Sequence, residues 1–171
     1  KTLKIATQAR EITSHFQTRL IINDHYKIAK EVKADGVHLG KNDVCPTLAR
    51  KHLHGWQMIG GTANTMEDCE NLLDKQIDYI SLGPYKKTTM KENLSPVLGL
   101  RGYIAITDVL MTPIPIIGVG GITTDDVKAL LEAGVSGIAV SEEITRDFDS
   151  IKTFNQLLKA SSTAEQRYTF E

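Results

Sequence analysis

The sequence has no long apolar run, no block of charges of one sign and few cysteines. No stretch approaches the roughly 20 apolar residues that a membrane-spanning helix needs. The opening residues have neither the apolar core nor the cleavage site of a signal peptide. The 20 basic and 21 acidic residues are mixed along the chain, so the net charge is −1 and no basic face is available for nucleic acid or a membrane surface. We therefore expect a cytoplasmic protein that binds small molecules, with no nucleic acid and no membrane as partner.

The cysteines and the length limit the class further. Cys45 and Cys69 form neither a CxxC pair nor a dense framework, which favours structural thiols in a reducing compartment. At 171 residues, 41% hydrophobic and 24% charged, the chain is long enough for one domain with a substantial core. We expect a single domain over residues 1–160, followed by a polar C-terminal tail over 161–171.

Short apolar runs alternate with segments of helical periodicity. The runs predict strands at 20–22, 36–40, 58–59, 79–82, 114–119 and 137–140. The periodic segments predict helices around 5–16, 26–32, 48–53, 66–73, 99–110, 123–134 and 151–158. None of the strands alternates strictly between apolar and polar residues, which is typical of parallel strands that are buried on both faces. The fold class is therefore α/β, and the periodicity alone fits a doubly wound sheet and a barrel equally well.

Polar and glycine-rich segments follow the predicted strands, where functional residues gather in parallel α/β folds. The exits contain Asn23-Asp24, Lys41-Asn42-Asp43, 60–65, 83–91 and 118–123. Carboxylates at two neighbouring exits, Asp24 and Asp43, have no Cys/His cluster nearby, a pattern that suits a hard cation such as Mg²⁺ with positions open for phosphate. Each carboxylate taken alone is equally compatible with a helix N-cap.

Three further features suggest phosphate chemistry, each with a simpler alternative. The Gly120-Gly121 turn precedes a helix and would present backbone N–H groups to an anion, or it serves tight geometry alone. Lys86, Lys87 and Lys91 share one loop and form either a charge clamp for diphosphate or a solvated surface. His38 lies inside a strand, which favours a hydrogen-bonded core histidine over a catalyst.

At these residues the sequence resembles a known family. The matching motifs run in order along most of the chain: LIIND at 20–24, ADGVHLG at 34–40 with Asp43, LGP at 82–84, GVGGIT at 118–123 and AGVSGIAV at 133–140. They resemble successive motifs of the thiamin-phosphate synthases, and that resemblance implies a (β/α)₈ TIM barrel. It also implies that Asp24 and Asp43 hold Mg²⁺ on a diphosphate.

The same resemblance assigns substrate contacts and a reaction. It implies that Asn23 and Thr62 contact the pyrimidine, that Thr88 and Lys91 contact phosphate, and that the Gly121 backbone binds the thiazole phosphate; Ser141 is a further substrate-binding residue. The reaction would condense 4-amino-2-methyl-5-(diphosphooxymethyl)pyrimidine with thiazole phosphate to give thiamin phosphate and diphosphate. The diphosphate leaves first, giving a stabilised pyrimidine-methyl cation. Lys91 would act as the catalytic residue by neutralising charge on that leaving group.

The chain also departs from the family pattern. The family begins with a strand, a helix and a second strand that ends in a Gln-x-Arg-x-Lys motif, so we expect a barrel whose N-terminal β-α-β part, with its first two strands, is missing here. Met90, Asn64 and Glu142 stand where a Thr, a His and a small residue are common. The alternatives are a thiazole tautomerase-like enzyme, which uses a His where this chain has Asn64, and a degenerate phosphate-binding regulatory paralogue. The oligomeric state is left open, a homo-oligomer included.

Overall fold

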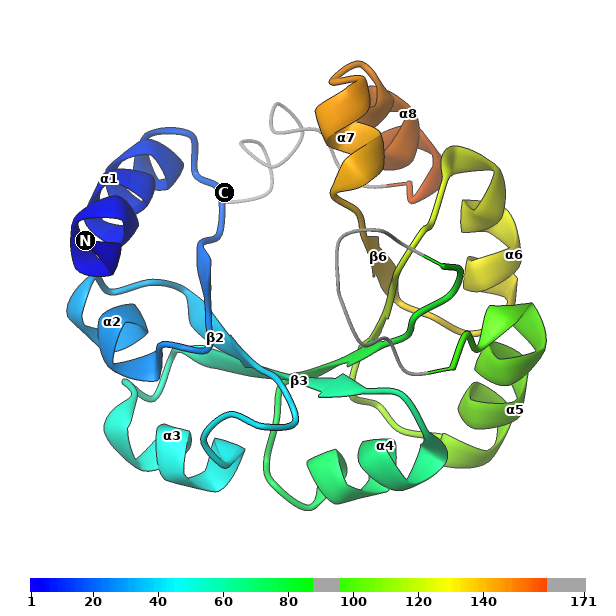
Figure 1. The fold of residues 1–171 in the computed structure, drawn as a ribbon, viewed down its shortest axis with the longest axis horizontal. Coiled ribbons are helices and arrows are strands. Elements are labelled where there is room, and N and C mark those ends of the chain that lie inside the picture. Colours follow the sequence, from blue (N-terminus) through cyan, green and yellow to red (C-terminus); the bar gives the residue numbers. More distant parts are fainter. Residues whose placement is uncertain (88–95, 160–171) are drawn as a thin grey trace, which may run out of the picture. The chain divides into compact units, whose positions relative to one another are not determined.

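The structure is a computed structural model that describes residues 1–87 and 96–159. It is an α/β protein in which helices and strands alternate (Figure 1). Its six strands belong to one sheet, and their order in the sheet is that of the chain, β1-β2-β3-β4-β5-β6. Contacts between residues divide the chain into two units, the first containing 1–81 and 112–115, the second containing 82–111 and 116–171. The alternating helices and strands confirm the α/β class. The boundaries of the single domain stay a prediction.

The first unit contains the N-terminal helices and strands. Its elements are α1 (Thr2–His15), β1 (Ile21–Asn23), α2 (Tyr26–Glu31), β2 (Gly36–Leu39), α3 (Pro46–His52), β3 (Met58–Ala63), α4 (Met66–Leu73) and most of β4 (Tyr79–Leu82). Strands β1, β2 and β3 are parallel, and the register sets Asn23 beside His38 and His38 beside Gly60. Helix α2 packs on β1 and β2, while α3 and α4 pack on β3.

The two faces of this part of the sheet differ because successive side chains point to opposite sides. Val37, Leu39 and Ile59 are almost completely buried and form the face that the helices cover. By the same alternation Asn23 and His38 belong to the opposite face. The carboxyl-terminal half of the unit's sheet therefore presents its polar side chains on one face only.

Strand β3 is longer than the sequence suggested. Residues 60–63 were expected to be a glycine-rich strand exit, but they continue the strand. A Cβ atom at Gly60 would overlap Cζ of Tyr79, and one at Gly61 would lie 2.5 Å from a methyl carbon of Leu72. The glycines thus allow close packing of a tyrosine and a leucine against the strand, and the expected loop at this position is wrong.

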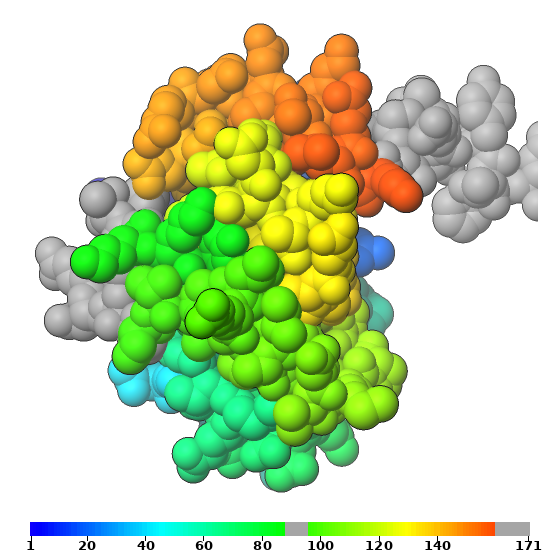
Figure 2. Space-filling model, turned by 90° about the vertical axis from the view of Figure 1, so that its right-hand side faces the viewer, coloured from blue at the N-terminus to red at the C-terminus, as the bar shows by residue number. Residues whose placement is uncertain are grey.

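The second unit is built around a buried tyrosine. Its elements are α5 (Gly99–Leu110), β5 (Ile116–Val119), the 3₁₀ turn η1 (Thr124–Asp126), α6 (Val127–Glu132), β6 (Gly137–Ala139), α7 (Glu142–Arg146) and α8 (Ser150–Leu157). β5 and β6 are parallel, with Ile117 beside Gly137. The hydroxyl of fully buried Tyr103 donates to the Leu82 carbonyl and accepts from the Val119 N–H at 3.2 Å. Helices α5 and α6 lie side by side on the surface in Figure 2.

Two local predictions in this unit have mixed outcomes. The N-terminus expected at Thr123 or Thr124 is confirmed, because Thr123 and Asp126 form a capping box, but the segment begins as the 3₁₀ turn before α6. The short helix α7 was not predicted, since its residues are mostly polar and carry no apolar stripe. Within the described part of the chain, no helix is long and apolar enough to cross a membrane.

Candidate active site

A histidine connects the polar side chains on the face of the first unit's sheet that is opposite α2, α3 and α4. Nε2 of His38 lies 2.9 Å from Oγ1 of Thr62, and Nδ1 lies 3.1 Å from the hydroxyl of Tyr79. The Tyr79 ring also stacks on the imidazole, with ring centroids 5.7 Å apart. His38 is therefore hydrogen-bonded on both sides, as expected, and it fixes the hydroxyl of the predicted substrate residue Thr62. Asn23 lies beside it in the sheet register.

The two predicted metal ligands stand at the carboxyl ends of β1 and β2. The backbone N–H of Asp24 donates to the His38 carbonyl at 2.9 Å, and Asp24 has a left-handed φ of 62°. Burial, together with a hydrogen bond and charge repulsion from Asp43, raises the pKa of Asp24 above its usual range. The Asp43 carboxylate is therefore near enough to influence the ionisation of Asp24.

Neither carboxylate acts as a helix cap. The N-cap residues of α2 and α3 are His25 and Cys45, and neither helix has a side-chain cap hydrogen bond. Asp43 instead closes the turn after β2, where its Oδ2 accepts the Gly40 N–H at 2.7 Å. The alternative interpretation of both carboxylates as N-caps is therefore not supported.

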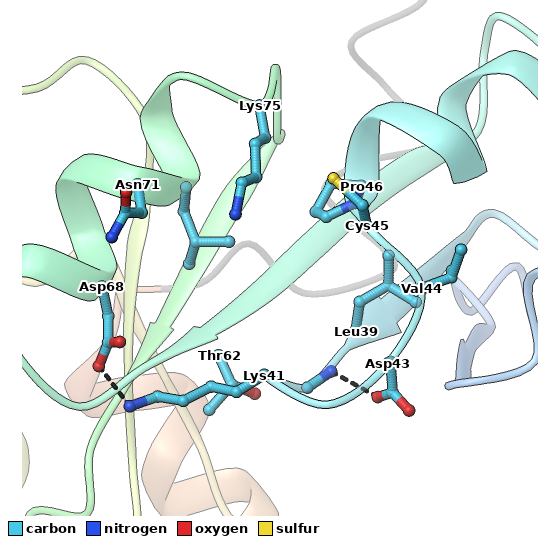
Figure 3. Close-up of a pocket in the computed structure, with 12 residues that line it drawn as sticks. Leu39, Lys41, Asp43, Val44, Cys45, Pro46, Thr62, Asp68, Asn71 and Lys75 are labelled. Atoms are coloured by element: carbon cyan, nitrogen blue, oxygen red, sulfur yellow. Dashed lines mark hydrogen bonds and ion pairs between the residues drawn. The ribbon is translucent and has the colours of Figure 1, made fainter.

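A pocket of about 270 Å³ opens beside Asp43 (Figure 3). It is bounded by the loop after β2, the end of β3 and one side of α4. Its lining residues are Leu39, Gly40, Lys41, Asp43, Val44, Cys45, Pro46, Thr62, Asp68, Asn71, Leu72 and Lys75. A predicted metal ligand, Asp43, and a predicted substrate contact, Thr62, therefore share one cavity in the first unit.

Lys41 crosses this pocket and contacts the start of α4. Its Nζ lies 2.5 Å from Oδ2 of Asp68. Asp68 also accepts the N–H groups of Asn64 and Thr65, at 2.9 and 3.0 Å, as part of the capping box of α4. Although burial acts in the opposite direction, the hydrogen bonds from Lys41 and the backbone lower the pKa of Asp68. Sequence reasoning placed Lys41 at a strand exit but assigned it no role.

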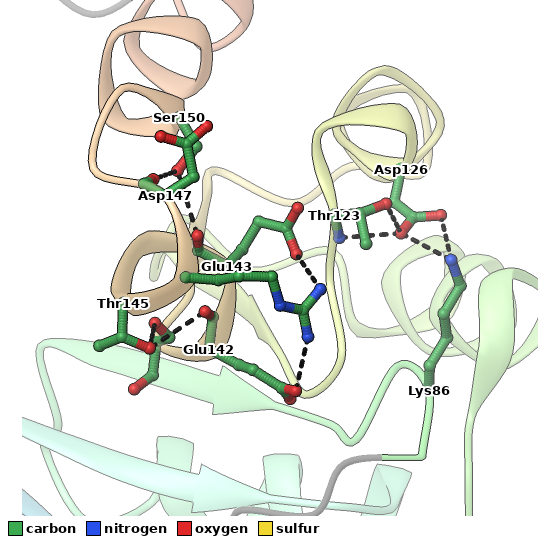
Figure 4. A network of polar contacts seen from close by, with 10 residues as sticks. Lys86, Thr123, Asp126, Glu142, Glu143, Thr145, Asp147 and Ser150 are labelled. Atoms are coloured by element: carbon green, nitrogen blue, oxygen red, sulfur yellow. Dashed lines mark hydrogen bonds and ion pairs between the residues drawn. The ribbon is translucent and has the colours of Figure 1, made fainter.

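In the second unit, the glycine turn after β5 lies against the loop after β4. Gly120 and Gly121 have φ values of +96° and +63°, and a Cβ at Gly121 would approach the Lys87 carbonyl to 2.8 Å. Close backbone approach is therefore one reason for glycine at this position. Nζ of Lys86 donates to both carboxylate oxygens of Asp126 at 2.7 Å, and this contact raises the pKa of Lys86 (Figure 4). Lys86 is engaged within the fold, so the described structure shows it neither as a free charge clamp nor as an unpaired surface lysine.

The remaining predicted residues fall into two groups. Ser141 is exposed at the N-terminus of α7. The neighbouring Glu142 forms an ion pair with Arg146 at 2.8 Å, so its negative charge is partly compensated (Figure 4). Thr88, Met90 and Lys91 lie outside the described residues.

The fold and the polar strand ends define an α/β protein with carboxylates, a fixed hydroxyl and a glycine turn at strand exits. Residues 1–144 match the family model described as thiamine monophosphate synthase. The chain is 41% identical to the thiamine-phosphate synthase of Bacteroides thetaiotaomicron over 157 residues, which cover 90% of this chain and 75% of that protein. It is 39% identical to the thiamine-phosphate synthase of Flavobacterium johnsoniae, covering 92% and 77% of the two chains.

A solved structure agrees with these relatives. The thiamine phosphate pyrophosphorylase from Pyrococcus furiosus matches with a TM-score of 0.76 at 25% identity, covering 92% of this chain and 75% of that one. The chain belongs to the thiamine monophosphate synthase family, whose matched relatives are transferases of thiamine biosynthesis.

Proposed function

We propose that this chain is a Mg²⁺-dependent thiamin-phosphate synthase that joins the pyrimidine diphosphate to thiazole phosphate. The observation that carries the proposal is that Asp43 and the fixed Thr62 hydroxyl line one pocket, with Asp24 at the end of the neighbouring strand, in a chain of this family. A cation would stabilise the charged form of Asp24, whose pKa is raised by burial and by the neighbouring Asp43 carboxylate. A pair of this kind, next to a cavity, suits a substrate that brings its own phosphate oxygens.

The residues fit Mg²⁺ better than a transition metal. Both side chains offer hard oxygen ligands. Among the residues that the structure describes, no group of three or more His, Cys, Asp or Glu side chains gathers to hold a metal, so the protein would leave most coordination positions to water and phosphate. Mg²⁺ bound by Asp24 and Asp43 would supply positive charge to the diphosphate as its bond to carbon breaks.

The proposed chemistry requires no protein nucleophile. The bond between the pyrimidine methylene carbon and the diphosphate oxygen breaks, and its electron pair leaves with the diphosphate. The thiazole nitrogen then donates its lone pair to that carbon. Asn23 and Thr62 would orient the pyrimidine, while Lys91 and Thr88 would hold the departing diphosphate. Contacts to the leaving group strengthen as its charge grows, which is the condition for raising the rate.

The thiazole phosphate would bind in the second unit. The backbone N–H groups around Gly121 and the Ser141 side chain are the proposed contacts, because a glycine turn exposes N–H groups to an anion. A carboxylate beside a phosphate would repel it, but the Glu142 charge is partly compensated by Arg146. Asn64 argues against a thiazole tautomerase, because that enzyme uses a His at this position. A degenerate paralogue would bind the substrates without turnover.

Three broader expectations accompany this proposal. Successive strand–helix units in sheet order and the similarity to the Pyrococcus furiosus protein support a (β/α)₈ barrel. A cytoplasmic location and small-molecule partners, without nucleic acid, fit the balanced charge. A homo-oligomer is compatible with the same function.

The test is a direct assay on the full-length protein with both substrates and Mg²⁺. Thiamin phosphate and diphosphate should form in equal amounts, and chelation of the metal should stop both. Tight binding of either substrate without product would replace the synthase assignment with the degenerate-paralogue alternative.

A further inference from the structure

Lys41 lies next to the proposed metal site. It is in the Gly40–Asp43 turn, which two hydrogen bonds close: Gly40 N–H to Asp43 Oδ2 at 2.7 Å and Asp43 N–H to the Gly40 carbonyl at 3.2 Å. Lys41, Asp43 and Thr62 line the same pocket. In Figure 3, Lys41 extends away from Asp43 toward Asp68. A turn that fixes Asp43 thus also fixes the origin of a long cationic side chain.

The hydrogen bonds of Asp68, the present partner of Lys41, to the start of α4 do not depend on the lysine. Asp68 keeps the N–H groups of Asn64 and Thr65 as donors if Lys41 leaves. The Lys41 side chain is 41% exposed, and exposed lysine–carboxylate pairs contribute little to stability. Lys41 can therefore exchange Asp68 for a more highly charged partner at small cost.

We propose that Lys41 is a diphosphate-binding residue, held on Asp68 until the pyrimidine diphosphate and its metal enter beside Asp43. This rests on the proposed function and adds a residue to that site. The four carbons of the lysine stem allow Nζ to swing within the pocket, and an ammonium group is a flexible point charge for phosphate. Since the diphosphate gains charge as it departs, the contact is strongest in the transition state.

The alternative is that Lys41 only braces the start of α4. The two roles predict different results for two variants that break the same ion pair. Lys41→Met removes the cation, whereas Asp68→Asn keeps it and releases it toward the pocket. A brace makes the variants equivalent, while a diphosphate-binding residue makes them differ.

The probe is inorganic diphosphate with Mg²⁺, titrated calorimetrically into the full-length protein. A charge-assisted contact implies that Lys41→Met weakens binding by about ten-fold or more. Asp68→Asn should bind as tightly as the wild type or more tightly, and Lys41→Arg should recover most of the loss. Lys51→Met, which removes an exposed charge of α3 outside the pocket, is the matched control and should stay within about two-fold.

The outcomes separate this proposal from the function on which it rests. If the wild type binds Mg²⁺–diphosphate and Lys41→Met binds it equally well, only the role of Lys41 is overturned. Equal losses in Lys41→Met and Lys51→Met, or in Lys41→Met and Asp68→Asn, overturn it too. If the wild type does not bind Mg²⁺–diphosphate, both the role of Lys41 and the proposed function fail.

Discussion

Nε2 of His38 lies 2.9 Å from Oγ1 of Thr62, so a strand histidine fixes the hydroxyl proposed to contact the pyrimidine. Thr62→Val should raise the KM for the pyrimidine diphosphate by roughly two- to ten-fold, the range of one neutral hydrogen bond. Steady-state kinetics measures it. Tyr79→Phe removes only the far partner of His38 and should have a smaller effect. A Thr62→Val enzyme with unchanged KM for the pyrimidine would show that this hydroxyl only anchors the histidine.

Asp35 should make the stability of the protein depend on pH in the acidic range. Although burial opposes it, hydrogen bonds from the Leu20 N–H and Arg10, both at 2.7 Å, lower the pKa of Asp35. Because its pKa is lower in the folded state, ionised Asp35 stabilises the fold at pH values above its pKa in the unfolded chain, about 3.9. This stabilisation is lost as the pH falls through the pKa of Asp35 in the folded protein. Asp35→Asn should therefore cost about 1–2 kcal/mol at neutral pH and progressively less below about pH 4.

Urea denaturation at several pH values measures this difference. The control is Asp74→Asn, a change at an exposed residue of the same unit. A difference between Asp35→Asn and the wild type that stays constant down to pH 2.5, about 1.4 units below the unfolded pKa, would contradict the prediction.

The two residues of the Lys86–Asp126 ion pair should contribute unequally to the stability of the protein. Asp126 is buried and also accepts from the N–H and hydroxyl of Thr123, whereas half of the Lys86 side chain is exposed. Asp126→Asn should cost about 1–2 kcal/mol of unfolding free energy, and Lys86→Met less than about 1 kcal/mol. Chemical denaturation compares the two variants, and a larger loss in Lys86→Met would contradict this account of the contact.

Gly121 should be intolerant of a side chain. Its φ of +63° and the 2.8 Å approach of a built Cβ to the Lys87 carbonyl mean that Gly121→Ala should destabilise the protein by about 1–2 kcal/mol. It should also raise the KM for thiazole phosphate more than that for the pyrimidine. Gly55→Ala is the control, because a Cβ there meets nothing within 4 Å. Equal effects of the two alanines on melting temperature would refute the strain argument.

Local patterns predicted the strands, the helices and the order of the polar strand ends, because apolar runs and caps depend on neighbours in the sequence. The prediction of Asp24 and Asp43 as metal ligands rests on the same local patterns. The packing of Tyr79 against Gly60 could not be identified, since it depends on the next strand in the sheet and makes a strand of an apparent loop. The ion pair of Lys86 could not be predicted for a similar reason: its partner, Asp126, lies 40 residues away in the sequence.

The contact of Lys41 could not be predicted from the sequence for the same reason. Nothing local distinguishes it from a solvated lysine, and the contact with Asp68 depends on α4 folding beside the loop after β2. One signal was available: Lys41 lies two residues before a predicted metal ligand at a strand exit. Basic residues at that position in related sequences would strengthen a prediction of this type.

The central claim is that Asp24 and Asp43 act together on a metal-bound diphosphate. The most direct measurement is the rate of thiamin phosphate and diphosphate formation by full-length wild-type, Asp24→Asn and Asp43→Asn proteins over a range of Mg²⁺ concentrations. The account predicts that each variant loses at least about a hundred-fold in rate, about 2.7 kcal/mol, while unfolding with nearly the same midpoint as the wild type. Wild-type rates with an unchanged Mg²⁺ dependence in both variants would contradict it.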